Sequence, residues 1–220
     1  MPEPGTPGPA LSEPAQSGPG LCEPGLPGLE GTGPGSLDLR VLAYDHPDSV
    51  ELIEAVQREY VARYGGVDAT PVAPPEFAAP LGLFMVGYVG GRPVVCGGWR
   101  LRSSGTDPRL RDGDVELKRM FVLEEYRGRG HARRLLAELE RAATIAGGNR
   151  IVLETGTKQP EAIALYRSSG YEPMPRFGVY RDSEHSLCFT KPLGLNERQV
   201  ENVGEATDDA AYPRKSRHRK

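Results

Sequence analysis

The sequence predicts an α/β (α+β) fold in which helices pack on a mixed β-sheet. Residues 83–89 and 93–101 are rich in β-formers and are joined by Gly90-Gly91, a pair typical of a tight antiparallel hairpin. Further along, residues 116–122, 132–146, 150–154 and 160–170 have the patterns of a strand, a helix, a strand and a helix. That order favours parallel pairing of the two later strands, so the sheet should contain both orientations.

The outer elements follow from local signals. Residues 39–44 alternate as a strand, and Pro47 with Asp48 marks a helix start, because proline and an acid both suit a first turn. This helix should end at Gly65-Gly66, with Ile53, Val56, Tyr60 and Tyr64 along one face. Residues 171–180 and 186–191 are expected to supply the closing strands.

Composition divides the chain into three parts. The 220 residues are 38% hydrophobic and 26% charged, which suits one globular domain. Residues 1–37 alternate proline and glycine with small residues and cannot bury enough surface to fold, so we expect a disordered tail. The domain should span 38–193. Residues 194–220, polar and then basic, should form a second disordered tail.

Charge and cysteine content limit partners and compartment. The formal net charge of −3 gives no field that would attract nucleic acid or an anionic membrane, although the basic end at 214–220 could touch either nucleic acid or an acidic protein. No apolar run approaches the ~18 residues of a membrane span, and the start resembles no signal peptide. Three cysteines make no disulfide framework, with Cys96 and Cys188 expected to be buried packing residues. The four histidines lack metal-binding spacing. We expect a cytoplasmic protein without metal.

The most informative stretch is the glycine- and arginine-rich segment 127–132, between a predicted strand and a predicted helix. A helix start exposes N–H groups without internal partners, and glycine lets backbone approach a ligand closely. Such a turn is an anion site suited to a pyrophosphate. The Gly-x-x-x-x-Gly-Lys-Ser/Thr nucleotide motif is absent, and Arg133 stands where a dinucleotide-binding loop needs glycine or alanine.

Arg127, Gly130 and Ala132 satisfy the pattern Arg/Gln-x-x-Gly-x-Gly/Ala. Together with the preceding strand and the later run Ala-Ile-Ala-Leu-Tyr-Arg-Ser-Ser-Gly-Tyr at 162–171, this resembles the GNAT superfamily of acyl-CoA-dependent N-acetyltransferases. The resemblance implies a twisted sheet splayed at its centre, helices on both faces, and acyl-CoA in the V-shaped cleft. It implies acetyl-CoA as co-substrate and a monomer or homodimer.

The resemblance also assigns the donor-binding residues. The diphosphate should be held by the turn itself, and the pantetheine arm should run beside the backbone of the central strand. Gln159 replaces the asparagine often found at its position, and its longer side chain would shift the contact to pantetheine or adenosine. The donor-binding residues are therefore Met120, Phe121, Val122, Arg127, Gly128, Arg129, Gly130, His131, Ala132 and Gln159.

Two side chains are candidates for proton transfer. Glu116 lies on the central strand where family members often place a base, and an acid in a half-buried strand is unusual; an ion pair is the alternative, and Glu54 or Glu154 could serve instead. Strand alternation puts Glu116 and Met120 on one face unless a bulge intervenes. Tyr166 matches the family position of the acid that protonates the leaving thiolate, with a packed aromatic as the alternative.

The acceptor is the least determined part. We expect a small-molecule amine, while an amino acid, an aminoglycoside and a peptide N-terminus stay open, as do a peptide or protein N-acetyltransferase and a non-catalytic acyl-CoA-binding module. The candidate walls of the acceptor site are aromatic: Tyr60, Tyr64, Phe84, Trp99, Phe177 and Tyr180.

Overall fold

The computed structural model describes residues 36–194, and the predicted tails therefore lie almost wholly outside the described residues. Leu37, at the boundary of the predicted N-terminal tail, is 2% exposed and belongs to the main core. The elements, in chain order, are β1 (Asp38–Val41), α1 (Pro47–Tyr64), η1 (Pro74–Phe77), β2 (Gly82–Val89), β3 (Arg92–Arg102), β4 (Asp114–Val122), η2 (Glu124–Tyr126), α2 (His131–Ile145), β5 (Arg150–Gly156), α3 (Pro160–Ser168), β6 (Glu172–Met174) and β7 (Ser186–Pro192).

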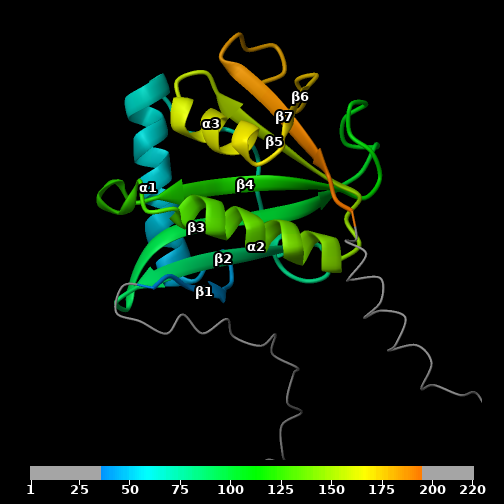
Figure 1. Ribbon diagram of the computed structural model, residues 1–220. Coiled ribbons are helices and arrows are strands. Elements are labelled where there is room, and N and C mark those ends of the chain that lie inside the picture. The colour runs from blue at the N-terminus through cyan, green and yellow to red at the C-terminus, as the bar shows by residue number, and fades with distance from the viewer. Residues whose placement is uncertain (1–35, 195–220) are drawn as a thin grey trace, which may run out of the picture.

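The strands form one seven-stranded sheet in the order β1-β2-β3-β4-β5-β7-β6. Among the strands of residues 36–194, β4 and β5 alone pair in parallel, and every other pair is antiparallel. Their ladder joins four residues of β4, Asp114 to Leu117, to Arg150 to Leu153 of β5. Both strands continue beyond it, and Figure 1 shows them diverging toward the end where α2 begins. The predicted mixed sheet, splayed at its centre, is confirmed.

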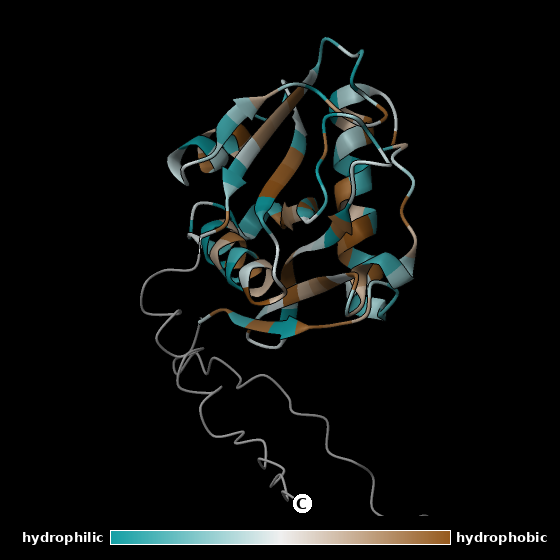
Figure 2. Ribbon diagram, turned by 90° about the vertical axis from the view of Figure 1, so that its right-hand side faces the viewer, coloured by the Kyte–Doolittle hydropathy of each residue, from teal (hydrophilic) through white to brown (hydrophobic). Residues whose placement is uncertain are grey.

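Helices cover both faces of the sheet (Figure 1). Leu135 and Leu139 of α2 share the main core with β3 and β4, and Tyr166 of α3 joins the same core. Leu52 of α1 packs into a second core on the other face, against Phe84 and Cys96. Figure 2 shows hydrophobic residues concentrated in the central strands, with mostly hydrophilic peripheral loops. No helix in residues 36–194 is long and apolar enough to span a membrane.

The predicted boundaries hold where local signals are strong. His46 caps α1 by accepting from the Asp48 N–H through Nδ1 at 3.2 Å, and Gly65 ends the helix at φ 80°. The face of α1 that packs in the core centres on Leu52 and Val56. Cys96 and Cys188 are buried free thiols, as expected.

One closing strand was predicted too long. Of residues 171–180, only Glu172–Met174 form a strand, β6, at the sheet edge. Pro173 and Pro175 lack the N–H that a ladder needs, which confines proline to edge strands and strand ends. The remainder is a loop, and that loop reaches the cavities described next.

Candidate functional site

Two connected cavities open where β4 and β5 diverge. We call the first, of about 350 Å³, the tyrosine cavity, because Tyr60, Tyr64, Tyr166 and Tyr180 line it. The second, of about 610 Å³, is the loop groove, lined by the turn before α2 and by facing parts of α1 and α3. The two share five lining residues, Tyr60, Met120, Gln159, Ala162 and Tyr166. A molecule lying in the groove can therefore present its end to the cavity.

The turn from Arg127 to Ala132 presents unpaired backbone donors to the loop groove. Gly128 and Gly130 have φ of 75° and 81°, a conformation that side-chain-bearing residues rarely adopt. Within residues 36–194, no protein group accepts a hydrogen bond from the backbone N–H groups of residues 128–133. The first N–H of α2 with a helical hydrogen bond is that of Arg134, which donates to Gly130 O at 3.0 Å. This row of donors lies at the positive end of the α2 dipole, which suits an anion.

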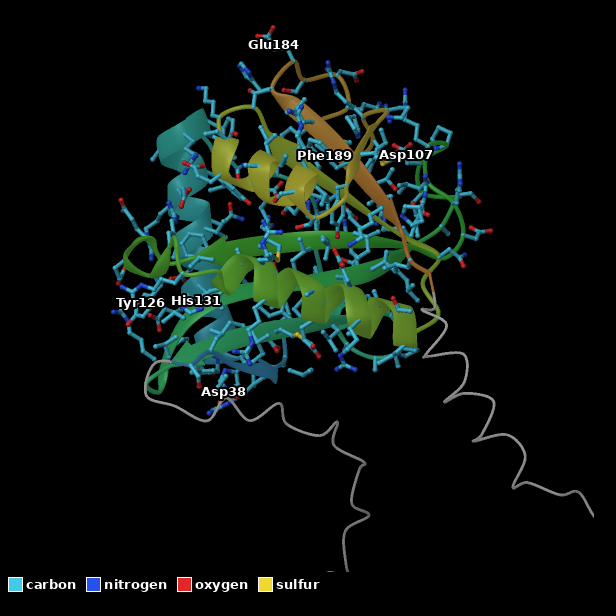
Figure 3. The ribbon with its side chains drawn as sticks, viewed as in Figure 1. Asp38, Asp107, Tyr126, His131, Glu184 and Phe189 are labelled. Carbon is cyan, nitrogen blue, oxygen red and sulfur yellow. The ribbon has the colours of Figure 1, made fainter. Side chains whose placement is uncertain are left out.

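Side chains hold this turn in place. The Arg127 guanidinium pairs with Glu59 of α1, and its Nε donates to Val122 O at 3.0 Å. The Arg129 guanidinium donates to Glu125 O at 2.9 Å and lies over the Tyr126 ring. Figure 3 shows Tyr126 and His131 together at the end of the sheet where α2 begins.

Most of the predicted donor-binding residues line the loop groove. They are Met120, Phe121, Val122, Arg127, Gly128, Gly130, His131, Ala132 and Gln159. Arg129 does not, because its side chain is folded back on η2. Burial, followed by the nearby Arg129 and Arg134, lowers the pKa of His131, so its ring is neutral near pH 7.

A bulge in β4 aims Met120 differently from simple alternation. Arg119 has φ of 59°, and the register with β3 shifts between Cys96 and Gly98. Met120 therefore packs toward Leu135 and Leu139 of α2, whereas Glu116 lies among the charges of the opposite face. The expected shared face of Glu116 and Met120 is thus corrected, because the extra residue resets the alternation.

The tyrosine cavity contains a cluster of buried charges. Asp68 lies in the loop that follows α1. Its carboxylate pairs with the Arg119 guanidinium and lies 3.6 Å from Lys118 Nζ. It also accepts a hydrogen bond from the Thr70 N–H at 2.8 Å. Burial would raise the pKa of Asp68, but the two cations and Thr70 outweigh it and lower the pKa to about 2. Neither Asp68 nor Lys118 was singled out from the sequence. A charged residue in a half-buried strand is unusual, and this signal, which singles out Glu116, also applies to Lys118 and Arg119.

We expect Asp68→Asn to lower the free energy of unfolding by about 3–5 kcal/mol, because it leaves Arg119 and Lys118 buried without a full counter-charge. In the wild type, the lowered pKa of Asp68 stabilises the fold above about pH 4, and this contribution is lost as the pH falls from 3.8 toward 2. Urea unfolding at several pH values measures both effects.

Asp38→Asn is the matched control, since Asp38 forms an exposed pair with Arg40. That variant should change the unfolding free energy by less than about 1 kcal/mol. Equally small losses of unfolding free energy in the two variants would show that the buried cluster stabilises the fold no more than an exposed ion pair does.

The three candidate acids lie in different surroundings. Glu116 is 3% exposed and pairs with Arg100 at 2.9 Å and Arg102 at 3.3 Å, and it lines neither cavity. Glu54 is largely exposed on α1 and also lines neither. Glu154 of β5 lines the tyrosine cavity, where Ser186 Oγ donates to it at 2.8 Å. Burial is the main cause that raises the pKa of Glu154.

Tyr166 lies where the two cavities meet. Its ring packs edge-on against Tyr171 at 5.5 Å and near Phe189 at 6.3 Å, which holds it on α3. Tyr166 lines both cavities, and its hydroxyl makes no hydrogen bond to residues 36–194. Burial raises the pKa of this phenol, so it is a protonated donor at neutral pH.

The candidate aromatic walls divide into two groups. Tyr60, Tyr64 and Tyr180 line the tyrosine cavity. Phe84, Trp99 and Phe177 are at most 3% exposed in the cores and line neither cavity. The Tyr180 hydroxyl accepts the Ala69 N–H at 2.6 Å, which joins the loop after β6 to the loop after α1. No group of three potential metal ligands occurs in the described residues.

A splayed sheet with a glycine turn at its cleft defines a fold that acyl-CoA N-acyltransferases share. The model of the "Acetyltransferase (GNAT) family" matches residues 51–171. An "IAA acetyltransferase" of Azospirillum brasilense is 35% identical over 149 residues, which cover 66% of this chain and 90% of that protein. This chain belongs to the GNAT acetyltransferase family, and the resemblance seen in its sequence is confirmed.

Solved structures agree with this fold. A Klebsiella pneumoniae protein assigned as an acyl-CoA N-acyltransferase is 26% identical with a TM-score of 0.58, and the match covers 72% of this chain and 98% of that one. The PaiA N-acetyltransferase of Thermoplasma acidophilum, solved in complex with coenzyme A, has a TM-score of 0.52 at 15% identity, with 71% and 99% covered. The second likeness is one of fold alone.

Proposed function

We propose that the protein transfers the acetyl group of acetyl-CoA to the amine of a small molecule by direct attack in a ternary complex. The observation that carries the proposal is the meeting of the loop groove and the tyrosine cavity at Met120 and Tyr166. The groove has anion-binding N–H groups at one end, and the cavity has acid–base groups at the other. The name of the Azospirillum relative supports acetyl transfer.

The donor would lie along the loop groove. The N–H groups from Gly128 to Ala132 would bind its diphosphate, with Gln159 near the pantetheine arm. Beyond Leu117 the β4 backbone has no β5 partner, so its main chain at Met120 to Val122 is open to this arm. A backbone N–H there would stabilise the tetrahedral oxyanion, a contribution worth about 2.7–4 kcal/mol per donor in measured cases.

Glu154 is the proton acceptor that we favour for the incoming ammonium. It lines the cavity, accepts a single hydrogen bond from Ser186, and has a raised pKa, whereas Glu116 is engaged by arginines. An ammonium with a pKa near ~10 must lose a proton before its nitrogen can attack. The nitrogen then bonds to the thioester carbon, and the carbon–sulfur bond breaks. Tyr166 would give its phenolic proton to the departing thiolate, and the second proton that the nitrogen loses as the amide forms would restore the phenol.

Binding of acetyl-CoA and release of its thiol test the proposal separately. At about 100 times its dissociation constant, acetyl-CoA should stabilise the protein by about 2.7 kcal/mol, which raises the midpoint of thermal unfolding by several degrees. NAD and ATP should do much less. Thiol release on a panel of primary amines should then identify acceptors. Binding without release on any amine would indicate a non-catalytic acyl-CoA-binding module.

A matched pair of glycines tests the turn itself. Gly130 and Gly147 both have φ of 81° with open space around the position of a Cβ, so alanine should cost about 1–2 kcal/mol of folding stability at either place. Gly130→Ala also puts a methyl group in the loop groove, and we expect at least a tenfold loss of acetyl-CoA affinity. Gly147→Ala, beyond the end of α2, should keep the affinity. Equal affinities in both variants would contradict binding at this turn.

A further inference from the structure

Lys118 is a buried cation to which residues 36–194 offer no hydrogen-bond acceptor. Its side chain is 7% exposed and lines the tyrosine cavity. The nearest carboxylate oxygens, on Asp68 and Glu116, lie 3.6 and 3.8 Å from Nζ, and no protein group in residues 36–194 accepts a hydrogen bond from it. An ammonium carries three donors, and leaving them unmade in a buried site is costly.

The neighbouring carboxylates are already engaged. Asp68 pairs with Arg119 and accepts the Thr70 N–H, and Glu116 pairs with Arg100 and Arg102. Glu76 completes this network through Arg100. Among the described residues the network thus joins four cations, Arg100, Arg102, Lys118 and Arg119, to three carboxylates. Lys118 therefore presents an ammonium of this network to the cavity, and Glu154, which belongs to no ion pair of the network, presents a carboxylate to the same cavity.

The cavity has the size and walls of a small-ligand site. About 350 Å³ is near the lower end for such pockets, which suits a molecule of amino-acid size. Its remaining walls include the rings of Tyr64 and Tyr180, which offer apolar surface. Glu154 lines the same cavity, so one carboxylate and one ammonium are presented to a single ligand.

We propose that the acceptor is a small zwitterion of the amino-acid class, whose carboxylate is bound by Lys118 while its amine faces Glu154. The proposal rests on the proposed acetyl transfer, because it names the substrate class of the same site. The ligand carboxylate accepts the hydrogen bonds that Asp68 and Glu116, at 3.6 and 3.8 Å from Nζ, do not accept. The rest of the ligand contacts the tyrosines.

Thiol release with matched acceptors tests this assignment. Each amino acid in the panel is compared with its decarboxylated amine and its primary amide, at saturating acetyl-CoA. We expect wild-type kcat/KM to favour the best amino acid over its decarboxylated amine by at least about 100-fold, because the amine leaves the Lys118 donors unpaired. In Lys118→Met the preference should fall below about tenfold, and Lys118→Arg should restore part of it.

Lys191→Met is the control, since Lys191 pairs with Glu140 at 2.7 Å and lines neither cavity. It should keep the wild-type preference, and thermal unfolding checks that each variant is folded. Equal wild-type kcat/KM for amino acids and decarboxylated amines would overturn the assignment without using any variant. So would an equal loss on all acceptors in Lys118→Met, which indicates a structural ion pair. Absence of thiol release with every amine would instead contradict acetyl transfer itself.

Discussion

Replacing Tyr166 by phenylalanine is expected to lower kcat by about 100-fold or more while the dissociation constant of acetyl-CoA stays unchanged. General acids contribute about 10²–10⁴-fold, and without the hydroxyl the thiolate departs unprotonated. The ring packing against Tyr171 and Phe189 is retained in the variant, so the fold should change little. Steady-state kinetics and acetyl-CoA titration measure the two quantities separately.

Two other tyrosines make this test specific. Tyr171→Phe removes a hydroxyl from the same aromatic cluster, but Tyr171 lines neither cavity, so kcat should stay near the wild-type value. Tyr60 lines both cavities from α1 and is the nearest rival. If kcat falls in Tyr60→Phe and not in Tyr166→Phe, the general acid is Tyr60 of α1. The assignment of Tyr166 from the family pattern at residues 162–171 would then be wrong.

Glu154→Gln should reduce kcat/KM by about 10²-fold or more at neutral pH and remove the acidic limb of the pH–rate profile. In the proposed mechanism, proton transfer needs the Glu154 carboxylate. Because burial raises the pKa of that carboxyl above 4.5, kcat/KM should fall as the pH drops through a value higher than that of an ordinary glutamate. The glutamine variant cannot titrate there, so its profile should be flat over the same range.

Glu116→Gln separates the two glutamates. This change leaves Arg102 without a carboxylate partner in the described part of the chain and weakens the buried network, so we expect lower stability with the acidic limb intact. If the limb disappears in Glu116→Gln and persists in Glu154→Gln, then the strand position that the family resemblance favours provides the base. Urea unfolding of both variants distinguishes loss of fold from loss of chemistry.

The sequence alone determined most of the elements and the glycine turn before α2. Both are local: a helix repeats every 3.6 residues and a strand every two, and Gly128 and Gly130 mark backbone that other residues avoid. Tyr166 could be found from the family resemblance, because its register with Gly170-Tyr171, just after the end of α3, matches the family pattern. The family followed from these residues in their order along the chain.

Only the tertiary structure decided which charges meet in the cleft. Asp68 and Arg119 are 51 residues apart, and neither lies in a pattern that predicts the other. Glu116 and Glu154 look equally suitable as strand acids, yet arginines surround one, and the other lines a cavity. The bulge at Arg119 turned Met120 toward α2. Ion pairs and bulges depend on segments that folding brings together, so periodicity, which reports on neighbours along the chain, does not reveal them.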